Sequence, residues 1–482
     1  MFTSLSTAAP LFAALLSSAA PAQKMPVQLL PPAQPPAVVQ TVPPAPPPVI
    51  APPVPIPPLS SSQKAFLAAW VKGGDAQGLG KAQLDDRALS GDMLVQAALD
   101  RAHALHSGRV DTADFLAIWA LRPAPYDARP ALAQAVAQDR LQQWTESLTP
   151  PYAGYDGLRQ GLQTYRRIRD EGGWARLSTG AAEGAVRQRL AIEDKTGGAG
   201  ESLVAALQRA QRRYGLKPTG LLDAATLAAL NVPVESRIAS IMANMERWRW
   251  MPRDMPVNRV QVNIAAAVLT VFEGDRPVTS MKAVTGRPGN ETPMLASSIH
   301  SVVVNPPWNV PSSIANKELW PQGRQTLIKK GYRFIKTPDG GERLQQASGP
   351  ANSLGRLKFD FDNPFAVYLH DTPARGKFSS YDRLASHGCI RLEKPVPLAE
   401  LMLQGSPDFA GKVQTLIDAG KTQRVSLPQQ VAVYLLYWTA FAGGNGVMNF
   451  REDPYGWDKL LAAKIEASSQ SAQSTIAASK EP

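Results

Sequence analysis

The sequence predicts an α+β protein in which a mainly helical N-terminal part precedes a β-rich C-terminal part. Three observations support this prediction. Residues 64 to about 256 are rich in Ala, Leu, Arg and Gln at helical spacing. From about Val257, β-branched residues cluster. The chain length of 482 residues is enough for several domains. Hydrophobic residues make up 44% of the chain and charged residues 19%, which is ordinary for globular proteins and argues against wholesale disorder.

The first 22 residues resemble a secretory signal peptide. A short apolar stretch, Leu11–Leu16, precedes small residues that end in Ala20-Pro21-Ala22, an A-x-A-like cleavage site. We therefore expect export to the periplasm. No later segment approaches 18 uninterrupted apolar residues, so we expect no stable membrane span.

A proline-rich segment follows the expected cleavage site. From Met25 to Gln63 there is no charged residue, and 15 of the 43 prolines lie between Pro26 and Pro58. Proline fixes φ and lacks an N–H donor, so this segment favours extended polyproline II and cannot build a core. We interpret it as a disordered spacer; the alternative is a ligand for a proline-recognising module.

The helical part contains a distinct unit between Ser202 and Val232. One apolar helix face is followed by Gly215, a fitting helix stop, and Asp223 is a plausible N-cap of a second helix. The pattern predicts a helical hairpin. Its spacing, LxxxLQxxxxxxGLxxTGxxDxxTxxAL, resembles the peptidoglycan-binding type 1 domain; the alternative is a helix pair with a purely structural role.

Strands are expected from about residue 257. Runs 257–264 and 267–272 are rich in β-branched residues and are followed by a turn at 273–275; further β-rich runs are 298–304 and 365–370. Between the last two runs, residues 308 to about 355 hold Lys, Gly and Pro in irregular order. We expect an insertion there that caps a site.

The residues that carry chemistry surround Cys389, the only cysteine in the chain, so no intramolecular disulfide is possible. A thiol with a pKa of about 8.5 needs a base or positive potential to act as a nucleophile at neutral pH. His370 and His387 are both close in sequence, and we prefer His370, because a neighbouring strand end brings it alongside. The N–H groups of Gly388 and Cys389 are expected to face a developing oxyanion, and Arg391 to hold a substrate carboxylate.

The run YLHDTP…SHGCIRL resembles the active-site signature of the YkuD-type L,D-transpeptidase catalytic domain, which has a β-sandwich-like fold. Further stretches, MERWRWMP from Met245, NPPWNVP from Asn305 and NSLGRLKF from Asn352, resemble the large Gram-negative L,D-transpeptidases of the YcbB type. The resemblance implies that Cys389 is the nucleophile and His370 the base, oriented by a nearby backbone carbonyl. It also assigns Ser386, His387 and Gly388 to the oxyanion region, Arg391 to the substrate site, and Tyr368 and Trp308 to the lining of the donor site.

The resemblance further implies 3→3 cross-linking of peptidoglycan by acyl transfer from a tetrapeptide donor stem to a diaminopimelate amine. No metal or organic cofactor is implied, and carbapenem-type β-lactams are expected inhibitors. The alternatives are an L,D-carboxypeptidase with the same site and a non-catalytic peptidoglycan-binding protein. The expected layout is a signal peptide (1–22), a linker (23–60), a helical scaffold (61–200), a peptidoglycan-binding domain (201–233), a connector (234–256), a catalytic domain (257–460) and a disordered tail (461–482).

The net charge of +11 suits a polymer that bears carboxylates, such as peptidoglycan. Nucleic acid would also attract a basic chain. However, no run of five to eight Lys or Arg residues occurs, and basic residues are interleaved with acidic ones. We therefore expect no nucleic-acid partner.

Overall fold

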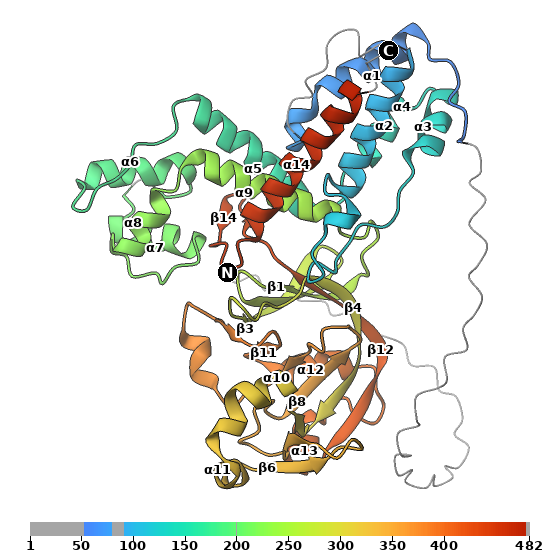
Figure 1. Cartoon of the computed structure of the whole chain (residues 1–482). Helices are drawn as coiled ribbons and strands as arrows, with labels where there is room; N and C mark the ends of the chain where they lie inside the picture. The colour runs from blue at the N-terminus through green and yellow to red at the C-terminus, as the bar shows by residue number, and fades with distance from the viewer. Residues whose placement is uncertain (1–52, 80–90, 199, 479–482) are drawn as a thin grey trace, which may run out of the picture. The chain divides into compact units, whose positions relative to one another are not determined.

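The computed structural model describes residues 53–79, 91–198 and 200–478. The expected signal peptide and most of the proline-rich segment lie outside these residues. The N-terminal part is helical, as predicted (Figure 1). Its helices are α1 (Ser61–Lys72), α2 (Gly91–Ser107), α3 (Ala128–Ala137), α4 (Leu141–Ser147), α5 (Ala153–Asp170), α6 (Glu183–Glu193), α7 (Leu203–Arg213), α8 (Ala224–Leu230) and α9 (Val234–Arg249), with 3₁₀ turns η1 (Gly74–Gln77) and η3 (Thr112–Asp114).

Side-chain caps explain where several of these helices begin. Ser60 and Gln63 form a reciprocal capping box at the start of α1. Ser202 caps α7, and the carboxylate of Asp223 accepts the N–H of Thr226 at the start of α8. Gly215, just past α7, has φ +71°, a conformation that favours glycine. Helices α7 and α8 therefore form the helical hairpin that the sequence predicts.

The C-terminal part is built on a nine-stranded sheet in the order β10-β3-β11-β9-β8-β4-β12-β1-β2. Strand β2 also pairs with β3, so the sheet closes on itself, a feature that the sandwich-like expectation did not contain. The strands of this sheet are β1 (Asn258–Asn263), β2 (Val268–Glu273), β3 (Arg276–Gly286), β4 (Leu295–Val304), β8 (Leu357–Phe361), β9 (Leu369–His370), β10 (Leu384–Ser386), β11 (Ile390–Leu392) and β12 (Gln423–Leu436).

Smaller elements complete this part. They are the hairpin β13 (Ala440–Ala442) and β14 (Met448–Phe450), helices α12 (Pro395–Leu403), α13 (Val413–Asp418) and α14 (Trp457–Ala478), and the 3₁₀ turn η6 (Arg375–Ser379). The predicted α+β class is confirmed. Among the described residues, the structure has no helix with both the length and the apolar character needed to cross a membrane.

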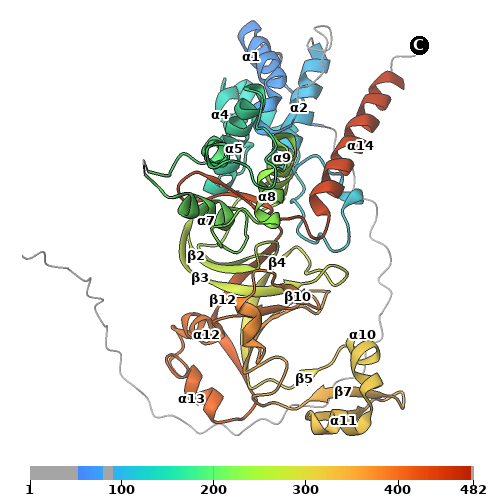
Figure 2. The same cartoon turned by 90° about the vertical axis from the view of Figure 1, so that its left-hand side faces the viewer.

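The insertion is a small folded unit, where the sequence showed only irregular order. Strands β5, β7 and β6 form their own sheet, and a core of buried residues that includes Leu327 and Leu344 holds the helices on it. Figure 2 shows α10, α11, β5 and β7 gathered together. The elements are β5 (Trp308–Asn309), α10 (Ser312–Ile314), the π-helical turn η4 (Ala315–Leu319), η5 (Trp320–Gln322), α11 (Arg324–Lys329), β6 (Tyr332–Lys336) and β7 (Glu342–Gln346).

Two local expectations were wrong. Of residues 365–370 only 369–370 form a strand, because the Asn363 side chain accepts the N–H groups of Phe365 and Val367 and so holds a turn. The expected disordered tail is helical from residue 461 to residue 478.

Helix α14 forms because its first turns have a buried face. Trp457, Leu461 and Ile465 recur at four-residue spacing; Trp457 and Leu461 are buried, and Ile465 packs against the same core. The sequence signal is weak because the rest of the helix is rich in Ser, Ala and Gln.

Candidate active site

The site lies at the adjacent strands β9 and β11. These strands are parallel, and Ile390 is in register with Leu369 and Arg391 with His370. One step back along both strands, Cys389 lies opposite Tyr368. Since side chains alternate along a strand, Tyr368, His370, Cys389 and Arg391 share one face. The topology thus brings together the cysteine, the histidine and the arginine that sequence reasoning singled out.

Cys389 is partly buried at the start of β11. Burial raises the pKa of its thiol, and the hydrogen bonds of Tyr368 and the positive charges of Lys358 and Arg391 act in the opposite direction. The free thiol is therefore protonated at neutral pH. A base must remove its proton for it to act as a nucleophile.

Tyr368 is a polar partner of that thiol. Its hydroxyl interacts with the thiol of Cys389 and with the indole of Trp308, and burial, followed by the effect of Cys389, raises its pKa. The Lys358 ammonium lies 4.3 Å from the centre of the Tyr368 ring. Tyr368 was expected only to line the donor site. The structure gives it direct contact with the candidate nucleophile.

His370 is buried and fixed in one orientation. Its Nδ1 lies 2.5 Å from the carbonyl oxygen of Asp371, and because a carbonyl oxygen only accepts, Nδ1 carries the proton and Nε2 is the acceptor. Burial, assisted by the charge of Arg391, lowers the pKa of His370 to about 3. The ring is therefore neutral above that pH. Among the described residues no hydrogen bond joins it to Cys389; the two lie diagonally across β9 and β11, with the Tyr368 ring 5.6 Å from the His370 ring.

The turn before Cys389 is held by two hydroxyl groups. Ser386 Oγ accepts the N–H of Gly388 at 3.1 Å and donates to the carbonyl of Cys389 at 2.6 Å. Thr292 Oγ1 donates to the carbonyl of Gly388 at 2.7 Å. Gly388 has φ +111°, so a side chain there would strain the backbone.

The hydrogen bond to Ser386 corrects one expectation. The N–H of Gly388 is already engaged, so it does not face a developing oxyanion. The N–H of Cys389, in contrast, has no acceptor within the described part of the chain. Thr292 was missed altogether, because a threonine almost a hundred residues before the cysteine carries no sequence signal of this contact.

His387 points to the insertion. Its Nε2 lies 2.6 Å from the Glu318 carboxylate and 3.2 Å from the Arg287 guanidinium, and the Glu318–Arg287 pair is 3.3 Å apart. Glu318 belongs to the π-helical turn η4, so His387 ties the insertion to the active-site turn. This contact, with that of Trp308 and Tyr368, places the insertion beside the site.

Arg391 is largely buried but has no carboxylate partner among the residues that the structure describes. Burial lowers its pKa, and the nearby Cys389 acts in the opposite direction. Other cations on the same sheet are paired: the carboxylate of Asp360 lies 2.6 Å from Lys358 and 2.8 Å from Arg424. An unpaired guanidinium beside a thiol suits an anionic ligand. No group of three His, Cys, Asp or Glu residues in the described ranges is arranged to hold a metal ion.

Three parts of the chain match known protein families. Residues 257–413 match the L,D-transpeptidase catalytic domain (YkuD), residues 66–162 match a family described as "Scaffold domain", and residues 188–230 match "Putative peptidoglycan binding domain". A curated relative from Haemophilus influenzae, named "Putative L,D-transpeptidase", is 29% identical over 247 residues. That match covers 47% of this chain and 50% of the relative, so the chain spans about half the length of this relative.

Solved structures also match. An L,D-transpeptidase from Mycobacterium smegmatis is 18% identical with a TM-score of 0.21, over 37% of this chain and 58% of that one. L,D-transpeptidase 3 from Mycobacterium tuberculosis, in complex with a faropenem-derived adduct, is 16% identical with a TM-score of 0.20, over 37% and 60%. An L,D-transpeptidase from Stackebrandtia nassauensis is 15% identical with a TM-score of 0.22, over 53% and 90%.

Proposed function

We propose that this chain, which contains an L,D-transpeptidase catalytic domain, forms 3→3 cross-links in peptidoglycan by cysteine acyl transfer. The observation that carries the proposal is the position of Cys389. Its thiol contacts Tyr368, shares a sheet face with a neutral, oriented His370, and lies beside the unpaired guanidinium of Arg391. A nucleophile, a base and an anion-binding group are the parts that acyl transfer from a peptide with carboxylates requires.

The first half-reaction cleaves the donor stem. His370 Nε2 takes the thiol proton while sulfur attacks the carbonyl of the third stem residue, and the N–H of Cys389 donates to the oxyanion. The bond to the terminal D-Ala then breaks. The proton on His370 goes to the leaving amine, D-alanine departs, and a thioester remains on Cys389. Arg391 binds a carboxylate of the stem peptide and so keeps the stem positioned at Cys389 throughout.

The second half-reaction transfers the acyl group. The side-chain amine of diaminopimelate in another stem attacks the thioester, His370 takes a proton from that amine, and the restored thiol leaves protonated. If water replaces the amine, the same site acts as an L,D-carboxypeptidase. No metal or organic cofactor takes part in either step.

We place this activity at the cell wall of the periplasm. The α7–α8 hairpin would hold the polymer near the site and so raise its local concentration. Two apolar side chains of this region are exposed, Val204 at 52% and Leu221 at 65%. Leu221→Ser should weaken co-sedimentation with isolated sacculi, while Val257→Ser, an equally exposed apolar position before β1, should not. Equal binding by both variants would make the hairpin purely structural.

The activity is tested by mass spectrometry of muropeptides. The purified chain is incubated with disaccharide-tetrapeptide, with Cys389→Ala as the control. Cross-linked dimers that have lost one D-Ala, absent with the variant, are the expected products. Tripeptide alone would establish the carboxypeptidase in place of the transpeptidase, and unchanged substrate would contradict both activities.

A further inference from the structure

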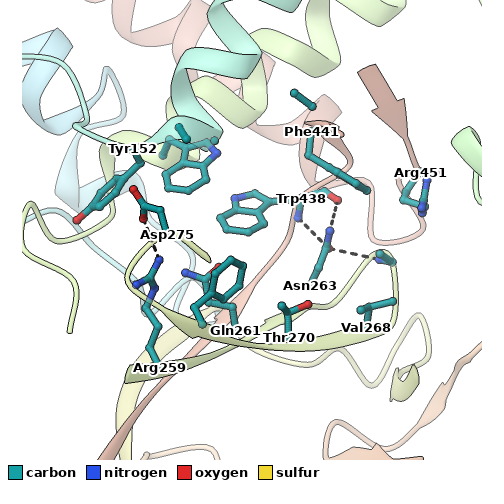
Figure 3. A pocket seen from close by; sticks show the side chains of 16 residues that line it. Tyr152, Arg259, Gln261, Asn263, Val268, Thr270, Asp275, Trp438, Phe441 and Arg451 are labelled. Atoms are coloured by element: carbon teal, nitrogen blue, oxygen red, sulfur yellow. Dashed lines mark hydrogen bonds and ion pairs between the residues drawn. The ribbon is translucent and has the colours of Figure 1, made fainter. Parts of the chain in front are cut away.

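A cavity of about 390 Å³ lies away from Cys389, between the outer face of strands β1 and β2 and helices α5 and α9 (Figure 3). This volume is within the range of roughly 300–1,000 Å³ typical of small-molecule sites. None of the residues of the candidate active site lines it. Strand β3 separates the cavity strand β2 from strand β11 in the closed sheet.

Aromatic rings form much of the cavity wall. Trp248 of α9 stacks on Trp438 with ring centres 4.7 Å apart and planes at 14°, and Tyr152 lies 5.5 Å from Trp248. Gly154 makes this possible, because a side chain there would overlap the Trp248 ring. Phe441 lies on another side, and Figure 3 shows it beside Trp438. The wall thus offers flat aromatic surfaces from several elements.

The floor of the cavity carries neutral polar groups. Gln261 of β1 is in register with Thr270 of β2, and both line the cavity. Gln261 is 4% exposed, and its amide nitrogen contacts only the sulfur of Met255, at 3.6 Å. Within the described ranges, neither the amide oxygen of Gln261 nor the hydroxyl of Thr270 has a hydrogen-bond partner. The Gln261 amide oxygen is thus free to accept a hydrogen bond from a ligand in the cavity, and the Thr270 hydroxyl is free to donate or accept one.

The charged groups of the cavity are partly satisfied within the chain. The Arg259 guanidinium pairs with Asp275 at 3.2 Å, although its Nε has no partner among the described residues. Arg451 donates to the carbonyl oxygens of Arg213 and Phe450. The fitting ligand has an apolar face for the rings and carries hydroxyl or amide donors for Gln261.

We propose that this cavity binds a sugar ring of the glycan chain of the cell wall. The C–H face of a pyranose is apolar and packs on aromatic rings. The hydroxyl and acetamido groups of the sugar can donate hydrogen bonds to the amide oxygen of Gln261 and form hydrogen bonds with the hydroxyl of Thr270. A proline-rich peptide would also suit aromatic walls, but proline has no N–H to give to Gln261. The assignment of this sugar to the cell wall rests on the function proposed above. The cavity would hold the glycan while Cys389 acts on its stem peptides.

The test uses the full chain with Cys389→Ala and, as probe, an oligosaccharide of alternating N-acetylglucosamine and N-acetylmuramic acid without stem peptides, with the lactyl carboxyl groups converted to amides so that the probe carries no charge. Gln261→Met and Thr270→Val are nearly isosteric and should each weaken binding at least tenfold in calorimetric titration. Thr279→Val, on the exposed part of β3, is the matched control and should bind like the parent. Thermal melting verifies that each variant is folded.

Two results would overturn the proposal: no binding by the parent, or equal binding by parent and variants. Binding of a peptide of residues 25–58 in place of the oligosaccharide would overturn it as well. Acylation of Cys389 by a carbapenem, measured with Gln261→Met in the native Cys389 background, should equal that of the native chain. Glycan binding without any such acylation would contradict the proposed function and leave the cavity assignment standing.

Discussion

Tyr368 lies where the parts of the candidate active site meet. Its hydroxyl contacts the thiol of Cys389 and the indole of Trp308, and its ring faces His370 and the ammonium of Lys358. A hydroxyl that donates to sulfur stabilises the thiolate more than the thiol, because charged acceptors form the stronger hydrogen bonds. Tyr368 therefore offsets part of the effect of burial on the pKa of the Cys389 thiol, and Trp308 holds the hydroxyl in place.

Tyr368→Phe removes that donor and keeps the ring. A hydrogen bond to a charged group is worth about 1.5–3 kcal/mol, so acylation of Cys389 by a carbapenem should slow about 10- to 100-fold. Stopped-flow fluorescence measures this rate. Tyr381→Phe, at a tyrosine that is 48% exposed, is the control and should react at the native rate. An unchanged rate in Tyr368→Phe would remove Tyr368 from the activation of the thiol.

The state of His370 predicts the pH dependence. Its pKa falls from 6.5 to about 3, and the thiol pKa is raised, so the neutral base and the protonated thiol coexist across the range between them. Acylation by a carbapenem should therefore stay nearly constant between about pH 5 and pH 8. A loss of rate on acidification with a midpoint near 6.5 would show that His370 titrates normally and would contradict the buried, neutral base.

Secondary-structure elements could be predicted from the sequence where the residues that determine them are close together in the chain. The α7–α8 hairpin could be predicted because Asp223 and Gly215 cap and end helices in their own segment. Cys389 could be singled out because it is the only cysteine in the chain. The hydroxyl of Thr292 and the contact of His387 with Glu318 were not readable. They join segments about 96 and 69 residues apart, and only the fold brings those segments together.

Helices α6 and α7 are joined by a buried carboxylate, Glu193, at the end of α6. Burial opposes its charge, but Arg213, at 3.3 Å, and Arg189, at 2.7 Å, outweigh burial and lower its pKa to about 2. Tyr165 donates to the same carboxylate at 2.5 Å. The charge of Glu193 thus neutralises the buried guanidinium of Arg189 and shares that of Arg213 with Asp194, which lies 4.0 Å from Arg213.

Glu193→Gln should lower the free energy of unfolding by about 3–5 kcal/mol at pH 7, because it leaves the buried Arg189 without a counter-charge and Arg213 with only the more distant Asp194. Urea unfolding measures the change, and Glu183→Gln, at the exposed start of α6, should cost far less. The native stabilisation by Glu193 is complete above its unfolded pKa of 4.5 and is lost as the pH falls towards 2. Equal stability of Glu193→Gln and the native chain would contradict this role.

At the scale of the molecule, the helical part and the β-rich part share one hydrophobic core, which includes Trp119, Leu158, Val260 and Leu435. Polar contacts cross the same boundary. Asn244 of α9 is fully buried; its amide nitrogen donates to Thr439 Oγ1 at 2.7 Å, and its amide oxygen accepts the N–H of Thr439 at 3.1 Å. The residue composition and spacing distinguish the helical part from the β-rich part. They do not show how closely the two parts pack.

Shared packing predicts shared unfolding of the two parts. Asn244→Ala leaves the N–H of Thr439 unpaired in the core, so it should cost about 1–3 kcal/mol and lower the melting temperature of both parts together. Circular dichroism reports the helices, and the fraction of Cys389 still acylated by a carbapenem after heating reports the site. Asn445→Ala, in an exposed loop, should leave both unchanged. Two separate transitions would show that the parts unfold independently.

Intact-protein mass spectrometry after incubation with a carbapenem shows whether Cys389 is the nucleophile of an acyl-transfer site. We predict an adduct of one carbapenem per chain, located on the peptide that contains Cys389. The adduct should be absent from Cys389→Ala and strongly diminished in His370→Gln. A native chain of unchanged mass, or an adduct that persists in Cys389→Ala, would show that Cys389 is not the nucleophile.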